Sequence, residues 1–295
     1  MLSKKQALTR MRVDIQLRGL SSNTRDAYLR DVNMFLDYCN RPIEELNEFH
    51  VRAFLQQLIN GKTKAPKTIN VYSAAIRFFF AVTLNRNLNY LQIPRMKEPK
   101  SLPVILSREE VNALISNCDN VKHKALLLLA YGSGLRVSEI ACLKIKDIDS
   151  KAMRIFVREG KGKKDRYTLL PDNTLHTLRD YWRKYRPKNP EGWLFPGTKN
   201  IGHITRNGIS YALETSLEKT AIKKNVSVHT LRHSFSTHLL EDGYSLLQIK
   251  ELLGHYNIQS TTVYLHLANT TEGITSPVDH INLSAPNVNR IARCF

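Results

Sequence analysis

The strongest constraint on the fold is a short segment, residues 93–103, that holds three prolines and three basic residues in eleven positions. Proline lacks a backbone N–H and disfavours regular structure, so this composition is typical of an extended, charged connector. A chain of 295 residues is also longer than one hydrophobic core usually holds. We therefore predict two domains with a linker and a tail: residues 1–92, the linker 93–103, residues 104–268 and the tail 269–295.

Apolar residues at helical spacing predict that the first domain consists of helices. They form stripes from Tyr28 to Cys39, from Val51 to Leu58 and from Ile69 to Phe80. Ser21 or Ser22 can cap the first of these helices, and Pro66 stands near the start of the third.

The second domain mixes helices with one predicted hairpin. Residues 107–110 read as a capping box, and residues 121–131 read as an apolar helix that stops at a Gly-Ser-Gly sequence. Residues 153–158 alternate between apolar and polar, and a Gly-Lys-rich turn separates them from residues 166–170. The predicted fold class is therefore mainly α with a small antiparallel sheet (α+β).

Both parts of the chain are basic. The net charge is +18, with 17 basic and 8 acidic residues in the first hundred positions and 27 and 18 in the rest. Lysine and arginine bind nucleic acids by displacing condensed counterions, so DNA is the first candidate partner. On charge alone, an RNA-binding or ribosomal protein and a basic soluble enzyme stay open as alternatives.

Cysteine usage and the apolar runs indicate the compartment. The four cysteines are widely spaced without a C-x-x-C pair, which is typical of reduced thiols: Cys39, Cys118, Cys142 and Cys294. The longest apolar run, residues 125–131, is too short to span a bilayer, and residues 1–10 lack the apolar core of a signal peptide. We expect a cytoplasmic protein without a membrane partner.

The segment richest in chemistry is His229-Thr230-Leu231-Arg232-His233. On a helix, His229, Arg232 and His233 lie within one turn, so their side chains can converge. A zinc site at the two histidines is disfavoured because the arginine between them would repel the cation and no H-E-x-x-H pattern is present. Taken singly, either histidine could instead satisfy a local hydrogen bond. The Gly160-Lys161-Gly162 turn lacks the spacing of a Walker phosphate loop.

Five motifs in order resemble those of tyrosine recombinases of the integrase/Xer type. The likeness runs from about residue 20 to residue 267, and Tyr264 stands nine positions after His255. The motifs are Gly134–Glu139, Gly160–Gly162, His229–His233, Leu253–His255 and Tyr264–His266. The resemblance implies a clamp of two domains around DNA: a helical N-terminal core-binding (SAM-like) domain and a catalytic domain.

The resemblance also implies a role for each site residue. Tyr264 would attack the scissile phosphorus and form a 3′-phosphotyrosine, so that neither ATP nor a metal or other cofactor is required. Arginine suits phosphate because its planar fork binds two oxygens and stays charged. The remaining roles are phosphate clamps (Arg136, Arg232), acid for the departing 5′ oxygen (Lys161), base for the tyrosine (His229), donor to the phosphorane (His255) and supporting residues (Glu139, His233).

The expected partners follow from the same resemblance. They are double-stranded DNA with specific sites, a second protomer on each site and four protomers in a synapse, with accessory proteins as a further class. The tail 269–295 is expected to contact a neighbouring protomer. Integration, excision and resolution of mobile elements or replicon dimers all use this chemistry. Two rivals stay open: a type IB topoisomerase and a DNA-binding regulator with an inert site.

Overall fold

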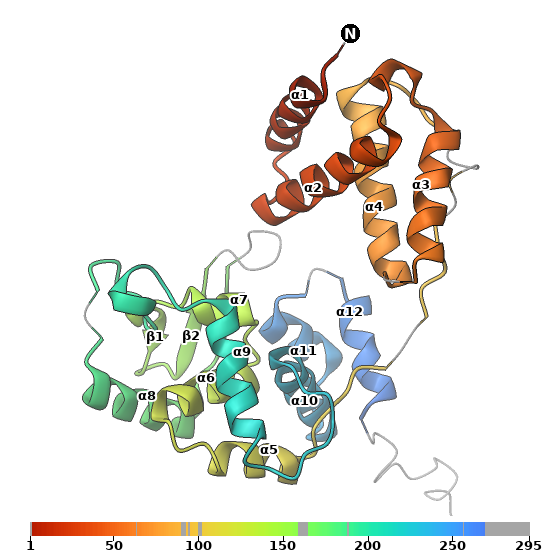
Figure 1. The fold of residues 1–295 in the computed structure, drawn as a ribbon. Helices are drawn as coiled ribbons and strands as arrows, with labels where there is room; N and C mark the ends of the chain where they lie inside the picture. Colours follow the sequence, from red (N-terminus) through yellow and green to blue (C-terminus); the bar gives the residue numbers. More distant parts are fainter. Residues whose placement is uncertain are drawn as a thin grey trace, which may run out of the picture. The chain divides into compact units, whose positions relative to one another are not determined.

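In the computed structural model the chain divides into two compact units, Met1–Lys100 and Ser101–Phe295 (Figure 1). The division falls within the predicted linker, residues 93–103; the predicted domain limits and the clamp around DNA stay predictions. The structure describes residues 2–62, 64–89, 93, 95–99, 102–158, 165–187, 189–255 and 257–268.

The N-terminal unit is helical, as predicted. Its elements are α1 (Lys4–Leu17), α2 (Ser22–Cys39), a 3-10 turn (Ile43–Glu45), α3 (Glu48–Asn60), α4 (Pro66–Phe78) and a π-helical turn (Phe79–Thr83). Helix α1 was not among the predicted helices. It is mostly polar, and it buries only a narrow stripe, Ala7, Met11 and Ile15, against the rest of the unit.

Local sequence explains where these helices begin. Ser21, rather than Ser22, caps α2, because its hydroxyl accepts a hydrogen bond from the backbone N–H of Thr24 at 3.2 Å. Pro66 occupies the first position of α4, where its missing N–H costs no helical hydrogen bond. Helix α4 packs against α2 (Figure 1), and the ring of Phe54 lies edge-on to the rings of Phe35 and Tyr72 in the core.

The C-terminal unit combines helices with one small sheet. Its elements are α5 (Arg108–Ser116), α6 (Val121–Gly132), α7 (Val137–Ala141), a 3-10 turn (Ile145–Asp147), β1 (Ile148–Asp149), β2 (Arg154–Val157), β3 (Arg166–Leu169), α8 (Asp172–Tyr185), a 3-10 turn (Thr198–Asn200), α9 (Arg206–Leu217), α10 (Val228–Glu241), α11 (Leu246–Leu253), α12 (Gln259–Thr262) and a 3-10 turn (Val263–His266).

The sheet has the antiparallel order β1-β2-β3, which confirms the predicted fold class and hairpin. In the hairpin Ile155 pairs with Thr168 and Val157 pairs with Arg166. Ile155, Val157 and Thr168 are buried, as expected when one face of a sheet covers a core. Strand β1 has two residues, too few to leave an alternating pattern. The Gly-Lys-rich turn, residues 159–164, lies outside the described residues.

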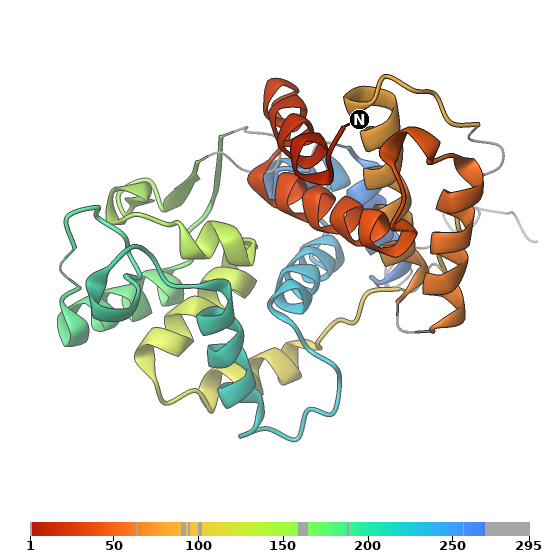
Figure 2. The ribbon, with the colours of Figure 1, turned by 45° about the horizontal axis from the view of Figure 1, so that its top comes forward.

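Helix α6 forms the centre of this unit. Five of its residues are buried: Ala125, Leu126, Leu127, Leu129 and Ala130. From Ala125 to Tyr131 the helix is apolar on every side and must be enclosed, and α8, α9 and α10 pack around α6 (Figure 2). Among the described residues, no helix is long and apolar enough to cross a membrane.

The turn after α6 depends on Gly134, which has a left-handed φ of +60°. A Cβ at this position would lie 2.5 Å from the ring of Phe235 on α10. The turn therefore needs glycine for both its backbone conformation and its close packing.

We predict that Gly134→Ala lowers the free energy of unfolding by roughly 2–4 kcal/mol, because backbone strain adds to overpacking. Gly202→Ala is the matched control, since Gly202 has the same φ of +60° with no atom within 4 Å of the added Cβ. The control should cost only about 1 kcal/mol. Urea unfolding of both variants measures the difference, and equal losses would contradict the packing argument.

Candidate active site

The described members of the predicted site come from α7, α10, the turn after α11 and the 3-10 turn Val263–His266 of the C-terminal unit. Arg136 is the N-cap of α7, and its main chain and side chain both bind Glu139 three residues later. The Glu139 carboxylate accepts the Arg136 backbone N–H at 2.9 Å and Nη1 at 2.7 Å. This reciprocal cap fixes the direction of the Arg136 side chain.

Arg232 is buried in the first turns of α10. Its Nη1 donates to the carbonyl oxygen of Gly134, and its Nη2 donates to the carbonyl oxygen of Leu253 at 2.6 Å. Nη1 also lies 3.7 Å from a Glu139 carboxylate oxygen. Burial, reinforced by the nearby charge of Arg136, lowers the pKa of Arg232 to about 9, which leaves the group charged at neutral pH.

A third arginine, Arg166 at the start of β3, binds the same carboxylate. Its Nη1 and Nη2 donate to the two oxygens of Glu139, both at 2.9 Å. Burial alone would raise the pKa of Glu139, but the hydrogen bonds and charge of Arg166, together with those of Arg136, outweigh it and lower that pKa to about 2.

The three arginines also bind three successive carbonyl oxygens at the end of α11. Arg166 Nε donates to Leu252 at 2.8 Å, Arg232 to Leu253 at 2.6 Å, and Arg136 Nη2 to Gly254 at 3.4 Å. The last carbonyls of a helix have no partner within the helix and carry the negative end of its dipole, so cations suit them.

Tyr264 is buried beside this layer of arginines, with 1% of its surface exposed. Its hydroxyl lies 3.1 Å from Nδ1 of His233, with which it shares a hydrogen bond. Its ring stacks on the His255 ring, with centroids 6.4 Å apart and planes 17° apart. Burial raises the pKa of Tyr264, and a hydrogen bond with Ser236 and the charges of Arg232 and Arg136 offset part of that rise.

The histidines differ in exposure and contact. His229 is exposed on the first turn of α10, and its ring centroid lies 6.4 Å from that of His233. Desolvation, with Arg232 nearby, lowers the pKa of His229, and burial lowers that of His233 to about 4. Both rings are therefore neutral at pH 7. His255 Nδ1 shares a hydrogen bond with the hydroxyl of Thr261 at 2.9 Å.

The structure thus gathers most of the predicted site. It brings together Arg136, Glu139, Arg232, His233, His255 and Tyr264. It places His233, expected only to support the site, on the tyrosine hydroxyl, whereas the expected base His229 lies at the exposed edge. Lys161 lies outside the described residues.

Within the described ranges, no cluster of three or more His, Cys, Asp or Glu side chains could hold a metal.

Sequence reasoning missed Arg166. One signal was available: Arg166 alternates with Thr168 and Leu170 on the inward face of the predicted hairpin. A charged side chain on a buried face requires a buried partner. The pattern says nothing, however, about which acidic residue that partner is.

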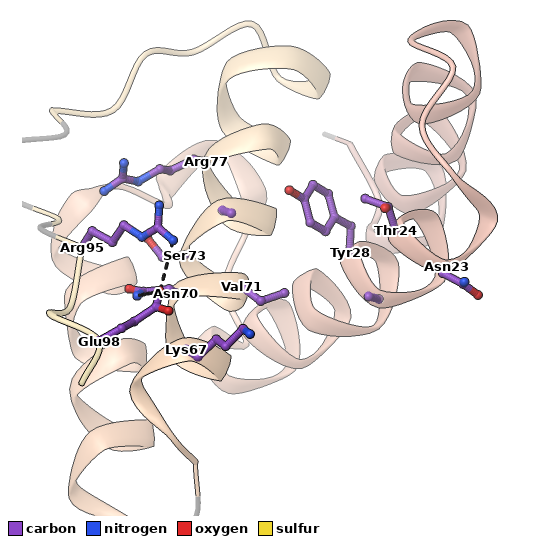
Figure 3. Close-up of a pocket in the computed structure, with 12 residues that line it drawn as sticks. Asn23, Thr24, Tyr28, Lys67, Asn70, Val71, Ser73, Arg77, Arg95 and Glu98 are labelled. Carbon is purple, nitrogen blue, oxygen red and sulfur yellow. Dashed lines mark hydrogen bonds and ion pairs between the residues drawn. The ribbon is translucent and has the colours of Figure 1, made fainter. Parts of the chain in front are cut away.

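The N-terminal unit has a cleft of about 570 Å³ between α2 and α4 (Figure 3). Three basic side chains line it, Lys67, Arg77 and Arg95, against one acidic side chain, Glu98. Glu98 is paired with Arg95 at 3.1 Å. The cleft is therefore electropositive and suited to an anion. Its other lining residues are Asn23, Thr24, Ala27, Tyr28, Asn70, Val71, Ser73 and Ala74.

Known proteins resemble both units of this chain. Residues 105–271 match the phage integrase family, and residues 8–90 match the N-terminal SAM-like domain of phage integrases. The chain is 40% identical over 279 residues to a putative integrase/recombinase, y4qK, of Sinorhizobium fredii, covering 94% of this chain and 90% of the relative. It is 35% identical over 269 residues to the tyrosine recombinase XerD of Oceanobacillus iheyensis, covering 85% and 89%.

Solved structures show the same fold. The XerA recombinase aligns with a TM-score of 0.53 at 26% identity, covering 90% of this chain and 96% of that one. The XerH site-specific recombinase, bound to a palindromic difH substrate, aligns with a TM-score of 0.71 at 19% identity, covering 92% and 83%. The chain therefore belongs to the phage integrase family and is a tyrosine site-specific recombinase, which confirms the resemblance seen in the sequence.

We predict that the free energy of unfolding falls as the solution becomes acidic, because Glu139 loses its charge. Its folded pKa of about 2 lies below the ordinary glutamate value, so its contribution is complete above about pH 5 and is lost as pH falls towards 2. Between pH 6 and pH 3 the wild type should lose about 2 kcal/mol more than Glu139→Gln. Urea unfolding at both pH values tests this, with the exposed Glu214→Gln as control. If Glu139→Gln loses as much unfolding free energy between pH 6 and pH 3 as the wild type does, the prediction is refuted.

Proposed function

We propose that this recombinase cuts DNA by attack of the Tyr264 hydroxyl on a phosphodiester that Arg136 and Arg232 bind. One observation carries the assignment: the buried Tyr264 lies within the electrostatic influence of Arg232 and Arg136, which share the Glu139 carboxylate with Arg166. The layer therefore has an excess of positive charge beside a phenol. Such a site stabilises the negative charge that develops when a phosphate is attacked.

The proposed step is a transesterification. The Tyr264 oxygen forms a bond to phosphorus while the bond to the 5′ oxygen breaks, leaving a 3′-phosphotyrosine and a free 5′ hydroxyl. The phenol proton goes to His229, the 5′ oxygen takes a proton from Lys161, and His255 donates to the phosphorane. One phosphate ester replaces another, so a 5′ hydroxyl from a second strand can reverse the step without ATP.

The proposal requires Tyr264 to leave His233 when DNA binds, because a hydroxyl on a buried side chain cannot reach a DNA phosphate. Tyr264 lies on a 3-10 turn of four residues, Val263–His266. His229, exposed and with a lowered pKa, is suited to accept the proton at the surface.

We predict that Tyr264→Phe binds its DNA site with unchanged affinity and forms no covalent complex. Wild-type protein incubated with supercoiled plasmids carrying paired sites should give recombinant products and a protein–DNA adduct that survives denaturation. Tyr244→Phe, at an exposed tyrosine after α10, is the control and should react like the wild type. A phosphotyrosyl adduct in Tyr264→Phe would refute the assignment, and relaxation without recombination would indicate a topoisomerase.

The basic cleft of the N-terminal unit is proposed to bind the DNA backbone. Phosphate contacts release counterions, so each contact contributes about one unit to the slope of log K against log salt. We predict that Lys67→Ala reduces that slope by about 1, uniformly across site sequences. Lys5→Ala, on the exposed side of α1 and outside the cleft, should leave the slope unchanged. Equal slopes for the two variants in a salt titration would argue against the cleft.

The assembly follows from the proposed chemistry. Exchange of strands between two duplexes requires four cuts, so we propose two protomers on each site and four in the synapse, with the tail 269–295 contacting a neighbour. The XerH structure was solved in complex with its DNA substrate. We also propose that the recombinase acts in the cytoplasm.

A further inference from the structure

Arg166 holds the Glu139 carboxylate more completely than either arginine of the proposed phosphate clamp. It makes a parallel pair of hydrogen bonds to both oxygens, and its Nε donates to the Leu252 carbonyl oxygen. Its side chain is 9% exposed, and that of Glu139 is 7% exposed. Arg166 is therefore occupied by the protein and is poorly placed to bind substrate.

The number of charges explains why a third arginine matters. Glu139 carries one negative charge and contacts Arg136 at 2.7 Å and Arg232 at 3.7 Å. With Arg166 in place, one cation balances that anion and two cations remain for a phosphate. Without it, the same carboxylate would be balanced by Arg136 and Arg232 themselves. A buried anion competes directly with an incoming phosphate for its neighbours.

The packing around Arg166 restricts its position. Gly254 has a left-handed φ of +61°, and a Cβ there would lie 2.7 Å from Cδ of Arg166. The arginine therefore lies against the backbone turn that leads into His255. The same guanidinium links β3, the start of α7 and the end of α11, three segments that are far apart in the sequence.

We propose that Arg166 is a positioning residue for DNA cleavage: it neutralises Glu139 so that Arg136 and Arg232 are free to bind the scissile phosphate. This inference rests on the proposed function. Arg166 acts through Glu139 and does not touch the reacting atoms.

The experiment compares single-turnover cleavage of two suicide DNA substrates. One has an ordinary scissile phosphate, and the other has a methylphosphonate, in which a methyl group replaces one charged oxygen. Arg166→Met should slow cleavage of the ordinary substrate by about 100-fold relative to the wild type, the size expected for a displaced catalytic group. On the uncharged substrate the loss should be under about tenfold, because less charge needs to be neutralised.

Removing the anion as well should restore activity. The double variant Arg166→Met/Glu139→Gln should cleave the ordinary substrate at least about tenfold faster than Arg166→Met, since no carboxylate then competes for the clamp. Arg154→Met removes an exposed arginine from the adjacent strand β2 and should leave both rates unchanged. Arg166→Lys, which keeps the charge and loses the fork, should fall between wild type and Arg166→Met.

Two results would overturn the inference. One is an equal loss on both substrates in Arg166→Met, without recovery in the double variant, which would mean that the arginine only supports the fold. The other is undiminished cleavage by Arg166→Met. Thermal melting and DNA binding establish that each variant is folded, and if Arg166→Met does not fold, Arg166→Lys decides on the same pair of substrates. The methylphosphonate substrate should also restore cleavage by Arg136→Ala. If it does not, the proposed phosphate clamp is rejected.

Discussion

The Glu139 carboxylate is the contact on which the site depends. It binds the main chain and the side chain of Arg136, both arms of the Arg166 fork, and lies within reach of Arg232. Like charges so close together repel in a buried layer, and the single anion among them offsets that repulsion. Because three cations surround one anion, the layer keeps a net positive charge, which is the property that a phosphate-cleaving site requires.

Much of the fold could be predicted because it follows from local rules. The serine caps, Pro66 and the Gly-Ser-Gly stop after α6 act within a few residues, and apolar periodicity identifies helices that bury a broad face. Helix α1 escaped because its buried stripe is narrow, and β1 escaped because two residues carry no period. Both are held by contacts with other elements, α1 by α2 and the π-helical turn and β1 by β2, and not by a pattern of their own.

The same distinction applies to the site. Arg136, Arg232, His255 and Tyr264 belong to motifs whose order is visible along the chain. The bond between Arg166 and Glu139 spans 27 positions, and the contact between His233 and Tyr264 spans 31. Composition and spacing indicate that such charged and aromatic residues need partners, but they do not choose between candidates. That choice is made by tertiary packing, which brings β3 to α7 in the first pair and α10 to the 3-10 turn Val263–His266 in the second.

The end of α11 has a consequence for how the chain tolerates change. Three arginines from three different elements dock on the carbonyl oxygens of three consecutive residues, and the next residue is His255. A helix turns by about 100° for every residue, so lengthening or shortening α11 by a single position would swing all three acceptors away at once. The exposed surface of α11 is open to substitution, whereas its length is restricted by the three arginines that bind its last carbonyl oxygens.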